Sequence, residues 1–189
     1  MNKMEGIFTL PYSEYEAINQ LTHSFKKSDG FAFFIPLSRQ QKGIDFLMLN
    51  QNSNKILKVQ VKASRSYKHS KETKNFIYGL WFNNFIDNFN ERNADLYILF
   101  GLYPYLSDGK NIKSKKRIWK SIILCFDSKE MYDLLLNVKT KKEQKKDRFF
   151  GFGFNETDEI FKERGFNKQE KISNHLLKNY YKKIEDMLK

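Results

Sequence analysis

Three polar residues stand inside two segments that otherwise have the composition of buried β-strands. Asp45 lies in IDFLML, which is apolar on both faces apart from this carboxylate and is typical of a strand covered on both sides. Gln60 and Lys62 alternate with valines in ILKVQVKA, after the polar turn NQNSNK. If the two segments pair as a hairpin, Asp45 comes within reach of Gln60 and Lys62. Because an isolated carboxylate is costly to bury, the polar patch formed by Asp45, Gln60 and Lys62 needs a chemical explanation.

The patch has the donor chemistry of a site for a hard divalent cation. An Asp carboxylate and a Gln carbonyl supply oxygen ligands of the kind that Mg²⁺ prefers, and Mn²⁺ accepts the same kind. A lysine beside them can orient a water molecule, assist its deprotonation and offset the negative charge that develops on phosphorus. Exposure to solvent is the ordinary alternative for Gln60 and Lys62.

A predicted helix over residues 12 to 27 supplies another acid. Ser13 is the expected N-cap, with Glu16 as its capping-box partner, and two lysines close the last turn. The apolar stripe of this helix consists of Ile18, Leu21 and Phe25. Glu14 lies one turn before the stripe and so points toward the core side, whereas Glu16 faces the polar side. Stabilisation of the helix dipole is the alternative role for Glu14.

Taken together, the helix acid, the strand acid and Gln60-Val61-Lys62 resemble the active-site motif of the PD-(D/E)XK nuclease superfamily. That motif has an acid on one strand and an acid, one spacer and a lysine on the next. Many members also carry a glutamate on a preceding helix. KVQVKAS is similar to the glutamine-containing branch, which includes certain homing endonucleases and Holliday-resolvase-like nucleases. The resemblance covers residues 12 to 65.

The resemblance implies a role for each of these residues. Asp45 would be the principal metal ligand, Gln60 a secondary ligand and Lys62 the catalytic lysine, with Glu14 as the matching helix glutamate. Gln60 stands where most members have Asp or Glu. A neutral amide binds a cation less strongly than a carboxylate, so a second negative charge has to come from Glu14.

The resemblance also implies a Mg²⁺-dependent DNA endonuclease, with Mn²⁺ able to substitute, of restriction-endonuclease-like α/β fold with a mixed central sheet flanked by helices. Homing, restriction and junction resolution remain open as its role. A double-strand cut by one small domain with one site favours a homodimer or higher homo-oligomer. The alternatives are a nucleic-acid-binding module of the same fold that does not cut and an RNA-cleaving enzyme.

The formal net charge of +12 and the pI of about 9.6 favour a polyanionic partner, and nucleic acid is expected rather than a membrane surface. Coding bias toward lysine is the other explanation of this charge. Basic residues near the patch can hold phosphates, and one tyrosine is available for stacking. These candidates are Arg39, Lys42, Arg65, Tyr67, Lys68 and Lys71. Residues 113 to 117 and 139 to 148 add positive charge.

The rest of the chain predicts one α/β domain over residues 1–189, with a core at 12–136 and a carboxyl-terminal strand and helices at 147–189. Strands are expected at FAFFIPL, which Pro36 ends or leaves at an edge, and at FIYGLWF, ADLYILFGLY, RIWKSIILCF and FFGFGF. Helices are expected at DSKEMYDLLLNV, NETDEIFKERG and the carboxyl end, whose apolar stripe consists of Ile172, Leu176, Tyr180, Ile184 and Leu188. SRSYKHSKETK is expected to be an exposed loop, and Gly151 and Gly153 are expected to allow a bend or bulge.

Other classes of site are set aside. Cys125 has apolar neighbours that favour a buried structural thiol. His23, His69 and His175 are too widely spaced, and lack the cysteine partners, for a structural zinc site. The chain has neither an apolar run that could cross a bilayer nor the long apolar centre of a signal peptide, so a cytoplasmic location is expected.

Overall fold

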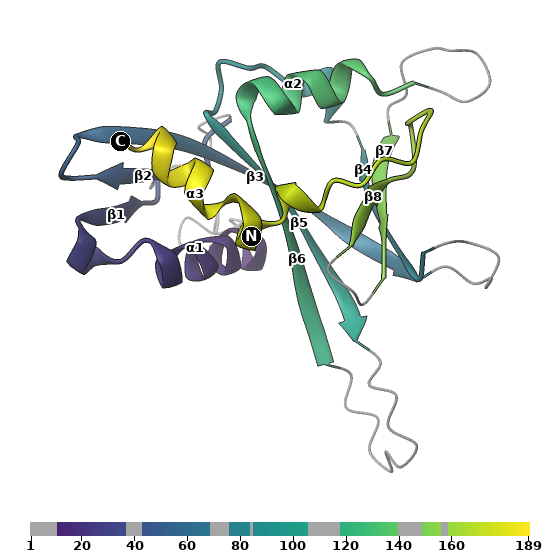
Figure 1. Ribbon diagram of the computed structural model, residues 1–189, viewed down its shortest axis with the longest axis horizontal. Helices are drawn as coiled ribbons and strands as arrows, with labels where there is room; N and C mark the ends of the chain where they lie inside the picture. Colours follow the sequence, from purple (N-terminus) through teal and green to yellow (C-terminus); the bar gives the residue numbers. More distant parts are fainter. Residues whose placement is uncertain are drawn as a thin grey trace, which may run out of the picture.

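The computed structural model describes residues 11–36, 43–68, 76–83, 85–105, 118–139, 149–155 and 159–189. Within these ranges the chain has a mixed α/β architecture, which confirms the predicted class (Figure 1). The elements are α1 (Tyr12–Ser24), β1 (Phe31–Phe34), β2 (Phe46–Asn50), β3 (Lys55–Lys68), β4 (Tyr78–Asn83), β5 (Leu96–Tyr105), β6 (Ile118–Asp127), α2 (Ser128–Leu136), β7 (Phe149–Phe154), β8 (Ile160–Lys162) and α3 (Leu177–Met187). Short 3₁₀ turns are η1 (Lys27–Asp29), η2 (Ile86–Asn88) and η3 (Ser173–His175). No helix within the described ranges is both long enough and apolar enough to span a bilayer.

Strand β3 belongs to two sheets. It pairs antiparallel with β2 and parallel with β5, which gives a five-stranded mixed sheet in the order β1-β2-β3-β5-β6. Its last residues, from Ser66 to Lys68, pair with β4, and β4 continues through β7 to β8 in an antiparallel sheet. Figure 1 shows the long β3 passing from the neighbourhood of β2 toward β4 and β8. The predicted hairpin of β2 and β3 is therefore confirmed and lies inside the larger sheet.

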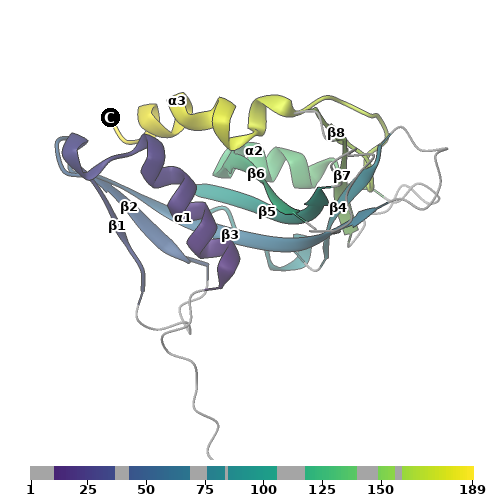
Figure 2. The ribbon, with the colours of Figure 1, turned by 90° about the horizontal axis from the view of Figure 1, so that it is seen from below.

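Helices cover both faces of the mixed sheet. One core lies under α1 and α3 and includes Ala17, Leu21, Val59, Val61 and Ile184. The other lies between the two sheets and α2 and includes Leu80, Tyr97, Leu99, Leu134 and Phe152. Helices α1 and α3 lie side by side (Figure 2), and the Tyr181 hydroxyl donates to the Gln20 carbonyl at 3.3 Å. The alternation in β3 thus sends its valines to one core and its polar residues toward the other.

The start of α1 differs from the prediction. Pro11 is the N-cap and makes no side-chain capping bond, and its carbonyl accepts the backbone N–H groups of Glu14 and Tyr15. Ser13 is therefore inside the first turn, and the predicted capping box with Glu16 is wrong. Glu16 instead accepts a hydrogen bond from Gln20 Nε2 at 2.8 Å. The helix also ends at Ser24, before the two lysines that were expected in its last turn.

Two other segments take a different conformation from the predicted one. The first residues of SRSYKHSKETK continue β3 instead of forming a loop, because Ser66 pairs with Leu80 of β4; residues 69–75 lie outside the described residues. NETDEIFKERG was predicted to be a helix, but Ile160–Lys162 form strand β8 on β7. Pairing with Phe154 buries Ile160 in the core, and this tertiary contact outweighs the local helix signals.

The glycines of β7 do not form a bulge. Gly151 and Gly153 pair in regular register with Trp81 and Gly79 of β4. A Cβ atom added at Gly153 would overlap the Phe76 ring, and one at Gly151 would overlap the Trp81 side chain. These glycines make room for aromatic rings against a flat part of the sheet.

The remaining strands and the last helix largely follow the prediction. β1 ends at Phe34, before Pro36, and pairs with β2. β2 was expected to be covered on both faces, but Leu47 and Leu49 are only half-buried. In the carboxyl-terminal segment all five predicted stripe residues are buried, although the helix itself begins at Leu177.

Candidate functional site

The first strand of the hairpin positions Asp45 against β3. Phe46 pairs with Val59 at the end of the β2–β3 register, and Asp45 is the residue directly before this pair. The Asp45 backbone N–H donates to the Val59 carbonyl at 2.8 Å, and its carboxylate Oδ2 accepts the Val61 N–H at 2.6 Å. The Asp45 side chain thus takes the place of a backbone carbonyl where the β2–β3 ladder ends.

Gln60 and Lys62 project from β3 on the face opposite to α1, beside the β5 residues with which they pair, Tyr97 and Leu99. Gln60 is only 9% exposed, and within the described residues its amide makes no hydrogen bond. Lys62 is half-buried, with its Nζ 5.8 Å from the centroid of the Phe85 ring. The Asp45 carboxylate thus contacts β3 at Val61, between Gln60 and Lys62, whose side chains share one face of the strand. That the three residues form one site stays a prediction.

Lys58 lies on the same face of β3 but has a different environment. Its Nζ lies 3.7 Å from the Asp95 carboxylate and donates to the Arg92 carbonyl at 3.1 Å. Asp95 Oδ2 also accepts the Lys58 backbone N–H at 2.8 Å. The sequence prediction overlooked Asp95, although its position at the head of an apolar strand, in ADLYILF, matches that of Asp45 in IDFLML. Asp95 engages Lys58, which distinguishes this lysine from Lys62.

Glu14 approaches β3 from the other side of the sheet. It lies in the first turn of α1, and that helix packs its buried Ala17 and Leu21 on the valine face of β3. Pairing of β3 with β2 stops at Val59, and pairing with β4 starts only at Ser66. Glu14 can therefore reach the other three residues only past the edge of β3 at residues 60–65, where the strand pairs with neither β2 nor β4. The strand pairing alone does not bring Glu14 to these residues.

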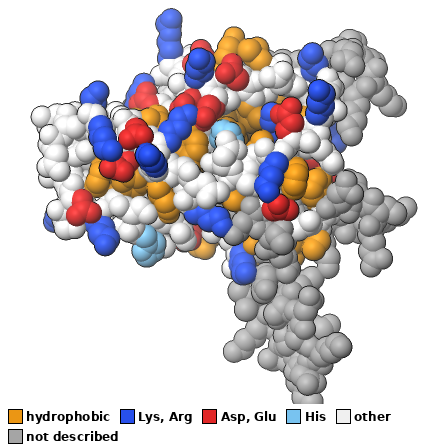
Figure 3. Space-filling view, in the orientation of Figure 1, with side chains coloured by type: hydrophobic (Ala, Val, Ile, Leu, Met, Phe, Trp, Pro, Cys, Tyr) orange, Lys and Arg blue, Asp and Glu red, His pale blue; other side chains and the backbone are white. Residues whose placement is uncertain are grey.

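The predicted phosphate-binding residues are only partly described. Arg39, Lys42 and Lys71 lie outside the described residues, as do residues 113–117 and 140–148. Arg65, Tyr67 and Lys68 continue β3 beyond Lys62, so these three belong to a strand and not to a loop. Figure 3 shows one face of the molecule, on which acidic and basic side chains are interspersed. This face therefore lacks the single-sign patch expected of a nucleic-acid interface.

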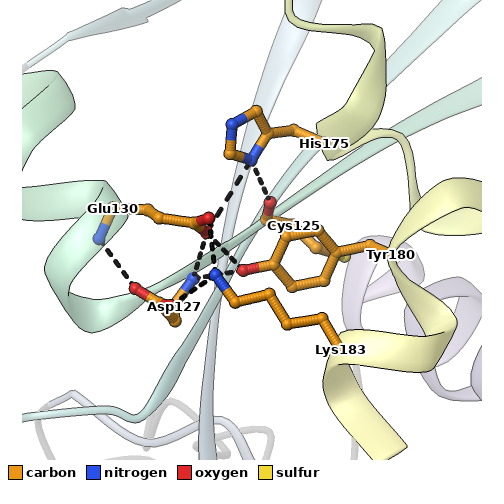
Figure 4. A network of polar contacts seen from close by, with 6 residues as sticks. All are labelled: Cys125, Asp127, Glu130, His175, Tyr180 and Lys183. Atoms are coloured by element: carbon orange, nitrogen blue, oxygen red, sulfur yellow. Dashed lines mark hydrogen bonds and ion pairs between the residues drawn. The ribbon is translucent and has the colours of Figure 1, made fainter. Parts of the chain in front are cut away.

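The densest polar network is elsewhere, where α3 meets the start of α2 (Figure 4). Lys183 Nζ bridges Asp127 Oδ2 at 2.6 Å and Glu130 Oε1 at 2.5 Å, and the Tyr180 hydroxyl donates to Glu130. His175 Nδ1 lies 3.0 Å from the Cys125 carbonyl. We name these residues the α2–α3 clasp: Asp127, Glu130, His175, Tyr180 and Lys183. Its polar groups are engaged with one another, which indicates that the clasp holds α3 on the sheet.

The electrostatics of the clasp follow from burial and pairing. Burial opposes ionisation of Asp127, but hydrogen bonds from the Glu130 backbone and from Lys183 leave the pKa of this carboxyl below its usual value. Burial similarly opposes the charge of Lys183, yet hydrogen bonds to both carboxylates raise its pKa. Burial lowers the pKa of His175. Cys125 is fully buried as predicted, and burial raises the pKa of its thiol.

The acidic side chains of the described residues do not form a metal-binding cluster on their own. Among the described residues, no cluster of three or more His, Cys, Asp and Glu side chains is arranged to hold a metal ion. Asp45, which contacts β3 at Val61, and the neighbouring Gln60 carry oxygen donors, and this donor chemistry fits a hard cation such as Mg²⁺.

Comparison with known proteins gives no relative. No family description, no curated protein and no solved structure matches the chain. Inferences about its function therefore rest on the residues and their geometry.

Proposed function

We propose that the chain is a metal-dependent DNA endonuclease of restriction-endonuclease-like α/β fold. Asp45, Gln60 and Lys62 form its site, and Glu14 contributes from α1. One observation carries the proposal: the Asp45 carboxylate accepts the Val61 N–H at 2.6 Å, and Val61 lies between Gln60 and Lys62, which share one face of β3. Asp45, Gln60 and Lys62 are the three strand positions at which the sequence resembles the PD-(D/E)XK motif.

The environments of the three side chains support a ligand-binding role. Gln60 is 9% exposed, and among the described residues its amide makes no hydrogen bond, so the part of the amide that reaches the surface can bind a ligand. The Val61 N–H fixes the orientation of the Asp45 carboxylate, and the Phe85 ring lies beside the Lys62 ammonium. The site is therefore built on strands and held by the packing around it.

Each residue then has a definite task. Asp45 and Gln60 would hold Mg²⁺ through oxygen atoms, with Glu14 adding negative charge. The ion would supply charge neutralisation at the phosphate and a more acidic water. Lys62 would orient the attacking water and stabilise the charge that develops on the phosphate oxygens.

A nucleic-acid-binding module of the same fold is the second candidate. It is favoured by the neutral Gln60 and by the lack of an acidic cluster among the described residues. Both candidates retain the net charge of +12 and a nucleic-acid partner. They differ in whether phosphodiester bonds are cut.

Cleavage of supercoiled plasmid and of a branched DNA junction tests the proposal, with Mg²⁺ or Mn²⁺ against EDTA. We expect metal-dependent cutting by the wild type and a loss of about 100-fold or more in Lys62→Ala. Lys58→Ala is the matched control, because Lys58 is on the same strand face but is engaged by Asp95, and it should cut like the wild type.

The outcomes separate the candidates. A folded wild type that binds DNA and cuts neither substrate with either metal would support the binding module. Equal cleavage activity in Lys62→Ala and the wild type would show that Lys62 is not a catalytic residue. RNA substrates assayed in parallel identify an RNA-cleaving enzyme, and sedimentation of the active species tests for the homodimer that a double-strand cut favours.

A further inference from the structure

A hollow of about 450 Å³ opens where the amino end of α1 meets the five-stranded sheet. Three aromatic residues from three elements line it: Tyr12 of α1, Phe100 of β5 and Trp119 of β6. The volume is within the range of pockets that hold small organic ligands. The hollow lies beside α1 and β3, and no residue of the clasp lines it.

The rings of the hollow are unusually open to solvent. Trp119 is 58% exposed and Tyr12 is 56% exposed, whereas Phe100 is buried beneath them. Tyr12 meets the Phe100 ring edge-on, with centroids 6.1 Å apart. Single exposed rings are common, but two large exposed rings that border one apolar hollow form a surface suited to a flat aromatic ligand.

Polar groups around the hollow favour a ligand with phosphate. Ser13 lines it from the first turn of α1, so the positive end of the helix dipole faces this region. The Ser66 hydroxyl also lines the hollow, but it donates its one hydrogen to the Leu102 carbonyl, so toward a ligand it acts as an acceptor for an N–H group of a base. The net charge of +12 favours a polyanion over a neutral ligand. A flat ring joined to phosphate is a nucleotide.

We propose that this hollow binds an unpaired base of a nucleic-acid strand, stacked between Tyr12 and Trp119. The inference rests on the proposed function, because it assumes a nucleic-acid substrate. Ala63 lines the hollow and directly follows Lys62, and Ser13 directly precedes Glu14. A strand whose base enters the hollow therefore reaches the candidate site around residues 60–65 of β3, which have no pairing with β2 or β4. The substrate class is nucleic acid with single-stranded or branched segments.

Tryptophan fluorescence reports this contact directly. The chain has two tryptophans, and Trp81 lies outside the hollow. Titration of the full chain with oligothymidylate in EDTA should quench emission in the wild type and in Trp81→Phe. The quenching should disappear in Trp119→Phe, which retains a stacking ring and should still bind the oligonucleotide.

Affinity variants test the energetic role of the rings. Trp119→Ala and Tyr12→Ala should each weaken binding of a labelled single strand about 5- to 100-fold, while binding of a duplex of equal length changes much less. Tyr15→Ala is the matched control, because Tyr15 lies on the same helix with 58% exposure but does not line the hollow. It should bind like the wild type.

Three results would overturn the proposal: unchanged single-strand affinity in a folded Trp119→Ala, equal loss for single strand and duplex, or loss of self-association without loss of DNA binding. The last would make the hollow a contact between copies. DNA cleavage without quenching of tryptophan fluorescence would refute the base pocket and leave the proposed endonuclease. Quenching without cleavage would support the base pocket and count against the endonuclease.

Discussion

Replacing Asp45 by Asn and by Ala separates the structural role of this side chain from its proposed metal-binding role. The carboxylate accepts the Val61 N–H at 2.6 Å, and an Asn side-chain carbonyl can accept the same bond without charge. Ala leaves that N–H without its acceptor, which costs about 1–3 kcal/mol in the free energy of unfolding. For a chain of 189 residues this corresponds to a fall in Tm of roughly 2–12 °C.

We therefore expect Asp45→Asn to unfold within a degree or two of the wild type in a thermal scan, and Asp45→Ala to unfold clearly earlier. Both variants should lose Mg²⁺-dependent cleavage, because an amide binds a hard cation less strongly than a carboxylate. Cleavage by Asp45→Asn at the wild-type rate would refute the assignment of Asp45 as principal metal ligand. Equal destabilisation by both variants would refute the account of the Val61 hydrogen bond.

Three further predictions concern the fold. Tyr180→Phe removes a hydroxyl from the α2–α3 clasp and should lower the unfolding free energy by about 1–2 kcal/mol, measured by urea titration. The stability contribution of Lys183 is present below its unfolded pKa, near 10.4, and is lost as the pH rises through the higher folded pKa. The stability contribution of His175 is lost as the pH falls from about 6.5, its unfolded pKa, through its lower folded pKa. Urea midpoints across pH should therefore fall at both ends. Lys183→Met should flatten the alkaline limb and also change the acid limb, because Lys183 helps to lower the pKa values of Asp127 and His175. Gly153→Ala should lower stability by about 1–3 kcal/mol in the same assay, because the added methyl group overlaps Phe76.

The β2–β3 hairpin could be predicted because the alternation of its residues and the polar turn between its strands indicate the same pairing. The valines of β3 repeat every two residues, and the polar turn before them fixes which segments pair. Burial of Val59 and Val61 under α1 then requires Gln60 and Lys62 to face the other way.

Other features depend on contacts that are distant in sequence. Ser13 and Glu16 satisfy the capping-box pattern, yet the observed N-cap is Pro11, two residues earlier, and it makes no side-chain capping bond. Ile160 lies in a segment with helix signals, but pairing with Phe154 determines its conformation. The hollow was also missed, because Tyr12, Phe100 and Trp119 have no common spacing in the sequence.

Asp45 and Asp95 use their carboxylates alike, since each accepts a backbone N–H of β3 at the head of an apolar strand. This bond explains a half-buried carboxylate at the head of an apolar strand without any ligand. The difference lies in the neighbouring side chains. Asp95 pairs with Lys58, whereas within the described residues Lys62 forms no ion pair and the Gln60 amide makes no hydrogen bond. Lys58 is therefore already paired within the protein, whereas the Lys62 ammonium and the Gln60 amide would find partners in a phosphate and a metal ion.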